Sequence, residues 1–220
     1  MFKTKENKDI FKAIHRSQHT QRNYDLGKTM PVEDFDLLVE AATQCPSKQN
    51  ISFYKAHFIT NRKLIEEIHS WTDGFTIYNQ KGITDKTTTN SQVLANLLIV
   101  FEAHRDPYAK DRNAETHAEQ NPDYELNYSK NWALERDQNM AIGIAAGYVN
   151  ITAAMLGYGT GCCACFMPDK IQEVMGIDGT PMLMMGVGFK QEGVNRRIHH
   201  KTGFKFPTLK KQPVARYFWN

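Results

Sequence analysis

The chain has 220 residues, of which 41% are hydrophobic and 23% are charged, and its formal net charge is +3. This composition is typical of a soluble globular domain and excludes a fibrous or disordered chain. The small net charge does not indicate a nucleic-acid-binding protein, although it leaves a local anion site open.

Helical and strand patterns alternate along the first half of the chain. Residues 7–16 and 31–44 have helical periodicity, and the second segment begins with a proline followed by acidic residues, as helix N-termini often do. Residues 53–60 alternate and are rich in aromatics, which predicts a strand, and residues 62–71 predict a helix. The nearly continuous apolar run 93–103 predicts a central strand that is buried on both faces.

The second half contains one long polar stretch. Residues 104–135 are polar and interrupted by prolines, which predicts a lid or partner-binding insertion, with a solvated insertion equally open. A long helix is predicted over 137–157, a short helix ended by glycine over 167–176, and a core strand over 181–190. Residues 202–220 form an extended tail that ends in ARYFWN, and we expect these aromatics to dock on a partner subunit.

Neither a membrane span nor a disulfide framework is expected. Residues 140–156 are the most apolar run, but the run is short for a span and contains Asn150 and Thr152. The N-terminus lacks the apolar stretch of a signal peptide. The four cysteines show no framework spacing, so we expect a reducing, cytoplasmic location without membrane association.

Two segments combine cationic groups with hydroxyl, amide or imidazole groups. They are HRSQHTQRNYD, residues 15–25, and NRRIHHK, residues 195–201. Guanidinium and hydroxyl groups suit a phosphate, although a solvated basic surface is the simpler interpretation of each segment. The candidates for phosphate binding are Arg16, His19, Thr20, Arg22, Arg196, Arg197 and Lys201.

A third polar segment, QCPSKQN, lies between a predicted helix and a predicted strand at residues 44–50. It offers many hydrogen-bond donors and acceptors on one turn. Turn chemistry alone explains its proline, serine and asparagine, so the segment is weak evidence by itself. Its candidate binding residues are Pro46, Ser47, Lys48 and Asn50.

The segment GYGTGCCACF, residues 157–166, has three cysteines in four positions. A structural zinc site needs four ligands, commonly in two pairs, and no second pair stands at a suitable spacing. Cys162 and Cys165 have redox-motif spacing, but they do not open a helix after a strand. We therefore expect a loop whose cysteines, including Cys163, are small buried packing groups.

Taken in order, these segments resemble the FMN-dependent nitroreductase family from about residue 10 to about residue 200. Thr20, Arg22 and Tyr24 match an Arg-x-Ser-x-Arg/Lys-x-Phe-like element, and CPS with Asn50 matches Ala-Pro-Ser and a following asparagine. The aromatic-led strand FYKAHFIT comes next. Later matches are the alanine-rich helix with its glycine turn, AAGYVNITAAMLGYGTG, the short loop CCAC, the Phe and Pro that precede DKIQEVMG, and the strand LMMGVGF.

The resemblance implies an α+β, three-layer fold with a central, mostly antiparallel mixed sheet flanked by helices and an extended C-terminal tail that reaches the partner subunit. Residues 1–220 would form a single FMN-binding domain, with the insertion or lid at about 104–135. The implied protein is a homodimer with FMN at the interface. It would use NAD(P)H to reduce nitroaromatics, quinones or similar electron-poor acceptors in a two-step flavin cycle. No side chain is expected as acid or base, because FMN carries the chemistry.

The resemblance also implies where each part of the flavin binds. The phosphate would lie among Thr20, Arg22 and one of Arg196, Arg197 or Lys201, with Arg16 and His19 nearby. The ribityl chain and ring edge would contact the segment that carries Pro46, Ser47, Lys48 and Asn50, and the pyrimidine would contact Asn90, Ser91 or Gln92. Backbone N–H groups would bond the reactive edge of the ring from Cys162, Cys163, Ala164 and Cys165.

Several alternatives stay open on the sequence. The same fold could serve reductive dehalogenation, flavin breakdown or an unusual oxidation, with the 104–135 insertion selecting the substrate. It could also serve a non-catalytic flavin- or partner-binding protein, and a metal-binding cysteine protein is a remote third. The sequence does not distinguish NADH from NADPH.

Overall fold

The structure is a computed structural model that describes residues 4–78, 84–88, 90–105, 131–208 and 210–219. Its helices are α1 (Lys5–Ser17), α2 (Val32–Thr43), α3 (Arg62–Ser70), α5 (Asn131–Leu156) and α6 (Pro168–Met175). Its strands are β1 (Tyr54–Ile59), β2 (Phe75–Tyr78), β3 (Thr84–Thr88), β4 (Leu97–Ala103), β5 (Gly159–Cys163) and β6 (Pro181–Gly188). Two 3₁₀ turns complete the list, η1 (Lys48–Asn50) and η2 (Ser91–Val93).

Local sequence fixes several helix ends. The Thr4 hydroxyl accepts a hydrogen bond from Asn7 N at the start of α1, and Asn61 caps α3 in the same way. Pro168 occupies the first turn of α6, where its missing N–H leaves no bond unmade. The helix ends at Gly176, whose φ of 62° lies in the left-handed region that favours glycine.

The central sheet has the strand order β1-β4-β6-β5, and each neighbouring pair is antiparallel. A mostly antiparallel sheet was predicted. The parallel contribution is confined to an isolated bridge between Thr20 and Thr160, which places residues near Thr20 along the outer side of β5. Strands β2 and β3 form a separate antiparallel hairpin.

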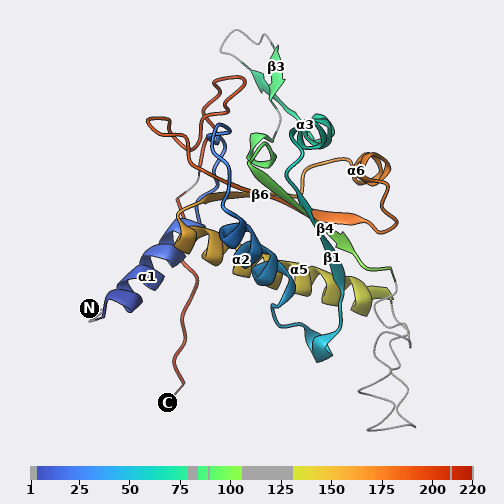
Figure 1. Ribbon diagram of the computed structural model, residues 1–220. Helices are drawn as coiled ribbons and strands as arrows, with labels where there is room; N and C mark the ends of the chain where they lie inside the picture. The colour runs from blue at the N-terminus through green and yellow to red at the C-terminus, as the bar shows by residue number, and fades with distance from the viewer. Residues whose placement is uncertain (1–3, 79–83, 89, 106–130, 209, 220) are drawn as a thin grey trace.

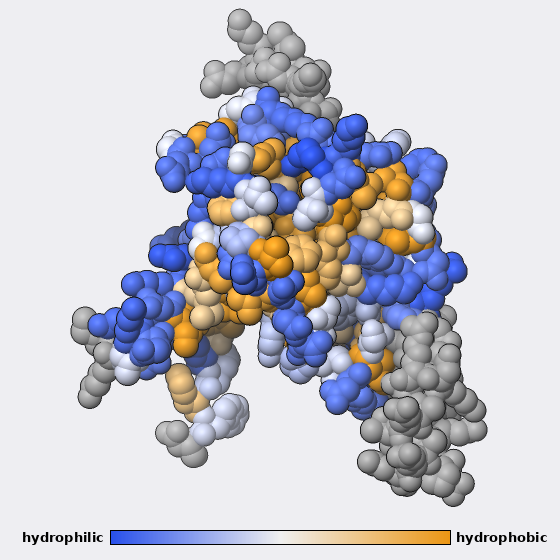
Figure 2. All heavy atoms as spheres, in the orientation of Figure 1, coloured by the Kyte–Doolittle hydropathy of each residue, from blue (hydrophilic) through white to orange (hydrophobic). Residues whose placement is uncertain are grey.

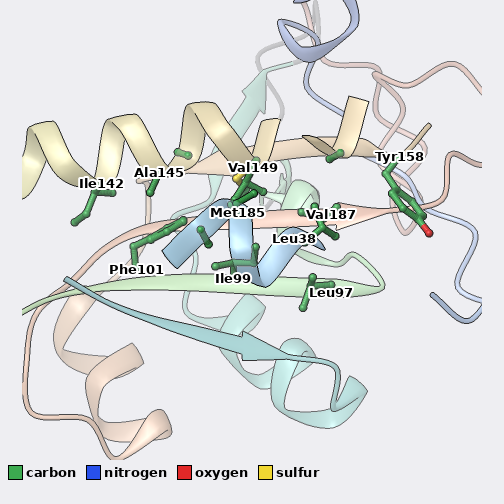
Figure 3. Packing of buried hydrophobic residues seen from close by; sticks show 14 residues of the cluster. Leu38, Leu97, Ile99, Phe101, Ile142, Ala145, Val149, Tyr158, Met185 and Val187 are labelled. Carbon is green, nitrogen blue, oxygen red and sulfur yellow. The ribbon is translucent and has the colours of Figure 1, made fainter. Parts of the chain in front are cut away.

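One face of the sheet is covered by α2 and α5 (Figures 1 and 3). Leu38 of α2 meets Ala145 and Val149 of α5 in this core, over Ile99 of β4 and Met185 of β6. All five side chains are buried, and burial of each large apolar side chain stabilises the fold by about 1.5–3 kcal/mol.

The opposite face is covered by α3, α6 and η2. Ile68 of α3, Ile171 of α6 and Val93 of η2 share a second core with Leu98 and Met184 of the sheet. The predicted three-layer α+β fold is therefore confirmed, with β4 and β6 buried between the two helical layers.

Three predicted boundaries were wrong. The strand expected over 93–103 begins at Leu97, because Ser91–Val93 forms η2. The loop expected over 157–166 contains β5, which pairs with β6. The insertion expected over 104–135 is shorter at its end, because α5 begins at Asn131. Residues 106–130 of that insertion lie outside the described residues.

Helix α5 leaves one apolar stripe exposed. Met140, Ile144, Tyr148 and Met155 are all exposed at helical spacing, and Figure 2 shows apolar side chains gathered near the middle of the face that carries α2 and α5. By length and composition Leu134–Leu156 could cross a membrane, but core helices of soluble proteins pass the same test. Its opposite side is buried against the sheet, as expected for a core helix.

In the tail, the described residues 207–208 and 210–219 have no regular secondary structure and extend away from the sheet (Figure 1). Tyr217, Phe218 and Trp219 are almost fully exposed in the single chain. Contact of this tail with a partner subunit stays a prediction.

Candidate functional site

Three segments that are distant in sequence meet at one edge of the sheet: residues 20–23, β5 and residues 195–198. Gln21 N donates to Thr160 O at 2.7 Å, which holds the chain after α1 against the edge of the sheet. Arg22 N donates to Arg196 O at 2.9 Å, and Asn23 Nδ2 donates to the carbonyls of Asn195 and Ile198. The two basic segments predicted from the sequence are therefore adjacent in the fold.

Arg22 is half-buried between η2 and the C-terminal segment. Its Nη1 donates to Gln92 Oε1 at 2.5 Å, and its backbone carbonyl accepts from Ser91 Oγ at 2.9 Å. No ion pair with a carboxylate is found for Arg22 among the described residues. Burial lowers the pKa of the Arg22 guanidinium, and Arg196 acts in the same direction. The site thus holds an unneutralised cation, which suits an anionic ligand.

The turn η2 links Arg22 to the cysteine segment. Gln92 Nε2 lies 3.4 Å from Cys162 O, and Asn90 Nδ2 lies 3.4 Å from Cys165 O and 2.9 Å from Asp73 O. A Cβ on Gly161 would lie 2.4 Å from Gln92 Cβ, so only glycine allows this approach. The predicted pyrimidine residues therefore do lie at the predicted loop.

A basic pocket of about 270 Å³ lies where α1 ends, beside the ends of α5 and β6. Arg16, His19, Lys190 and Arg196 line it, together with the hydroxyl-bearing residues Ser17, Tyr158 and Thr160. Among the described residues, no carboxylate lines the pocket. The pKa of Lys190 is lowered by burial and by Arg16, and that of His19 by burial and then by Arg196. Repulsion between converging cations indicates a site for an anion.

The structure separates the three candidates in the segment 195–201. Arg196 lines the basic pocket, and its Nη1 donates to Thr20 O at 2.9 Å. Arg197 instead donates to Thr208 Oγ1, and Lys201 Nζ lies 3.8 Å from Glu66 Oε1. Arg196 is therefore the member of this set whose position fits a phosphate shared with Thr20.

The segment with Pro46, Ser47 and Asn50 lines a different pocket, of about 580 Å³, which it shares with Tyr148 of α5. This pocket has no lining residue in common with the basic pocket. In η1, Gln49 and Asn50 have φ values of 54° and 56°, and such backbone strain concentrates at functional sites.

Lys48 lies in an ion pair with α5. Its Nζ lies 2.7 Å from a carboxylate oxygen of Asp137, which is buried. Burial raises the pKa of Asp137, but hydrogen bonds from Lys48 and Arg136 outweigh this effect and the net shift is downward. The pair ties η1 to the start of α5 and places the Lys48 ammonium at this carboxylate.

The cysteines differ from one another. Cys163 is buried, as expected, and its thiol donates to Cys165 O at 3.6 Å. Burial raises the pKa of the Cys163 thiol to about 11, so it is protonated at neutral pH. Cys162, Ala164 and Cys165 are exposed in the single chain, which corrects the expectation of buried packing groups. All four cysteines are free, and no cluster of three His, Cys, Asp or Glu side chains suited to a metal occurs in the described ranges.

Sequence reasoning missed some residues of the site. Lys190 and Tyr158 line the basic pocket, yet Lys190 is a lone lysine after an apolar stretch, and Tyr158 lies in the segment GYGTGCCACF, of which only the glycines and cysteines were given a role. The sequence places Thr160 in a predicted glycine-rich loop. In the structure it belongs to β5, and its hydroxyl donates to Asn150 Oδ1 of α5. Only the structure could show these contacts.

Comparison with known proteins gives one family and a consistent fold. The sequence model described as "Nitroreductase family" matches residues 16–189. A search of curated protein sequences gives no match.

Three of the similar solved structures illustrate the fold. One, from Staphylococcus epidermidis, is named as an NAD(P)H:FMN oxidoreductase; it is 17% identical, with a TM-score of 0.66 over 89% of this chain and 92% of that one. A second, from Exiguobacterium sibiricum, is named as a nitroreductase in complex with FMN; it is 15% identical, with a TM-score of 0.66 over 92% and 93%. A third, a nitroreductase family protein from Streptococcus pneumoniae, is 17% identical, with a TM-score of 0.62 over 92% and 100%. At these identities the likeness shows the fold.

Proposed function

The chain belongs to the nitroreductase family, and from this premise we propose that it is an FMN-dependent oxidoreductase that takes hydride from NAD(P)H and reduces electron-poor small molecules. The observation that carries the proposal is the convergence of unneutralised basic groups, Arg22 and Arg196, with η2 and the cysteine segment at the edge of β5. The FMN complex of a protein with this fold supports the same cofactor.

The residues present fit the phosphate end of FMN. The basic pocket presents Arg16, His19 and Arg196 without a carboxylate, and it adds Lys190, which the sequence did not indicate. A phosphate monoester carries up to two negative charges, so it would relieve the repulsion between these cations. Thr20, whose carbonyl already accepts from Arg196, would hold the phosphate between this pocket and Arg22.

The residues also fit the ring end. Gln92 and Asn90 present amide groups beside the carbonyls of Cys162 and Cys165, and glycine at 161 lets the backbone approach closely. We expect the backbone N–H groups of Ala164 and Cys165 to face the reactive edge of the ring. When bound, FMN supplies hydride acceptance and donation, and the protein supplies binding, orientation and a preorganised electrostatic environment. Burial raises the pKa of the Cys163 thiol to about 11, so we expect it to act as a neutral packing group beneath the ring.

We expect a homodimer. The exposed stripe of α5 is apolar, and Tyr148 on this stripe also lines the pocket of Ser47 and Asn50. Pairing two copies across α5 would bring this pocket of one subunit toward the flavin of the other, which explains why one chain keeps its two pockets apart. The aromatic tail gives the partner further apolar contact. Four free cysteines agree with a cytoplasmic location, which we expect.

The proposal is tested on the purified full-length protein. Added FMN is expected to bind and to change its fluorescence, and anaerobic NADH or NADPH is expected to bleach the bound flavin. Nitroaromatics and quinones are then expected to restore the yellow colour. A protein that binds FMN but is bleached by neither nucleotide would be a flavin-binding protein without this activity, and a protein indifferent to FMN would refute the proposal.

Two variants locate the phosphate. Arg196→Ala is expected to weaken FMN binding roughly 10- to 100-fold, as loss of a charge-assisted hydrogen bond does. The matched control is Lys12→Ala, an exposed cation on α1 that lies outside the basic pocket. Riboflavin, which lacks the phosphate, should bind both variants and the natural protein with similar affinity.

A further inference from the structure

Arg22 rests on an aromatic ring rather than on a carboxylate. Its Cζ lies 3.8 Å from the centroid of the Phe206 ring, within the range of a cation–π contact. The imidazole of His199 lies nearly parallel to the Phe206 ring, with an interplanar angle of 12° and a centroid separation of 6.3 Å. Both Phe206 and His199 are buried, so the contact is shielded from water.

Backbone hydrogen bonds place Phe206 under the guanidinium. Phe206 N donates to Arg197 O at 3.0 Å, and His199 N donates to Phe204 O at 2.8 Å, so residues 197–206 form a closed turn. The bridge between Ile198 and Lys205 completes this turn. The two bonds from Asn23 Nδ2 then fasten the turn to the Arg22 segment.

The His199 imidazole is neutral. His199 Nδ1 accepts from Lys201 N at 3.0 Å and from Thr202 N at 3.3 Å, which leaves the proton on Nε2. Burial, followed by nearby His200 and Lys201, lowers the pKa of His199 to about 4. A neutral imidazole adds no charge beside Arg22, so the stack leaves the full positive charge of the guanidinium in place.

We propose that Phe206, supported by His199, is a positioning residue that holds Arg22 for the flavin. A carboxylate could hold an arginine equally firmly, but it would cancel the charge that an anionic ligand needs. The face of a phenyl ring orients the guanidinium and leaves that charge available. Gln92 fixes the other side of Arg22 through its Oε1. This inference rests on the proposed function, because it assumes that Arg22 contacts FMN.

The test is a double-mutant cycle on the full-length protein, with the FMN dissociation constant measured by flavin fluorescence. Phe206→Leu is expected to weaken binding roughly 5- to 30-fold, the range of a desolvated cation–π contact. Phe206→Tyr keeps the ring face and is expected to stay within about two-fold of the natural protein. In an Arg22→Gln background, Phe206→Leu is expected to change binding by less than about two-fold, because the contact is already lost.

Phe35→Leu is the matched control, since it removes a half-buried ring that packs edge-on against Phe58 on the other face of the sheet. Melting curves check that each variant folds. If Phe206→Leu does not fold, Phe206→Met, whose side chain has a similar volume, takes its place.

The outcomes are distinct. If Phe206→Leu binds FMN as tightly as the natural protein while Arg22→Gln does not, the inference is overturned and the proposed function stands. Equal losses from Phe206→Leu with and without Arg22 would show a merely structural role and would also overturn it. Failure of the natural protein to bind FMN would refute the proposed function itself.

Discussion

Two buried carboxylates in this protein form ion pairs with cationic side chains. The arginines of the candidate site, by contrast, form no ion pair with a carboxylate among the described residues. Glu102 lies 2.6 Å from His57 Nε2 and 3.1 Å from Lys55 Nζ, and Asp137 is paired with Lys48. Arg22 and Arg196 have no ion pair with a carboxylate in the part of the chain that the structure describes. The contrast separates charges that are paired within the fold from charges that are open to the proposed anionic ligand.

Substitution of Glu102 tests whether the buried, paired carboxylates stabilise the fold. The Glu102 side chain is fully buried and also accepts from Gly179 N at 2.7 Å, so Glu102→Ala would leave the buried Gly179 N–H and His57 without this acceptor and Lys55 with Asp178 alone. We expect the free energy of unfolding to fall by about 3–5 kcal/mol, measured by urea denaturation. Asp178→Ala is the control: Asp178 also contacts Lys55 but is exposed, so little change is expected. A Glu102→Ala protein of unchanged stability would contradict the assignment.

The buried histidines predict acid sensitivity. Burial first, and neighbouring cations second, lower the pKa of His69 and His199 from 6.5 to about 4. Between these values the unfolded chain binds protons that the folded protein does not, so stability is lost as the pH falls from 6.5 toward 4. Each histidine is expected to contribute a slope of about 1.4 kcal/mol per pH unit. Urea denaturation at a series of pH values measures this slope. In His69→Gln the free energy of unfolding should change with pH by about 1.4 kcal/mol per pH unit less than in the natural protein, because one titrating group is gone.

At the residue scale, the sequence indicated which polar residues belong to the candidate site better than it indicated which residues contact them. The convergence of Arg22, Arg196 and the η2 amides agrees with the predicted set, because their dense polar motifs were visible in sequence. Phe206 and Lys190 were missed, because a lone phenylalanine in an extended tail and a lone lysine after a strand carry no pattern. Their roles depend on turns and bridges that bring distant segments together.

The turn η2 can lie close to the sheet only because β6 has a glycine, Gly186, at the point of contact. A Cβ on Gly186 would lie 2.0 Å from Gln92 O, a backbone atom that cannot turn aside. We expect Gly186→Ala to displace η2, to lower the free energy of unfolding by about 1–3 kcal/mol and to weaken FMN binding through Gln92. Chemical denaturation and FMN titration measure the two effects.

Gly27→Ala is the comparison for that substitution. A Cβ at Gly27 would meet Asp25 Oδ1 at 3.4 Å, which is ordinary contact, and the φ of Gly27 is not positive. A stable Gly186→Ala protein with natural FMN affinity would show that η2 can move without consequence.

Helices α1, α2, α3 and α6 were predicted to within a few residues, since caps and periodicity mark their ends. Strand β5 was not predicted, because GTGCC has neither β-branched alternation nor apolar length. It forms because β6 pairs with one of its edges and the segment near Thr20 lies along the other, so long-range pairing replaces local propensity.

At the scale of the whole molecule, α5 would join the predicted dimer to the proposed flavin site. Gly143 and Gly147 lie on its exposed stripe, and a Cβ at either position would meet nothing within 4 Å in the single chain. Small residues beside Ile144 and Tyr148 permit close approach of a second helix.

Ile144→Lys tests the dimer. A charge in the middle of the stripe is expected to shift the protein from dimer to a 25.2 kDa monomer in sedimentation experiments and to weaken FMN binding with it. Glu67→Lys, on the exposed side of α3 across the sheet, is expected to change neither quantity. A natural protein that is monomeric and still binds FMN would refute the interfacial site.

The hydrogen bond from Gln21 N to Thr160 O and the isolated bridge between Thr20 and Thr160 fasten the chain after α1 to the edge of β5, although this segment has the composition of a loop. In deuterated solvent the amide protons of Gln21 and Arg22 should therefore be retained for as long as those of β5. The amides of the last ten residues should exchange at once in the monomer, and slow exchange there would report that a second copy has covered them.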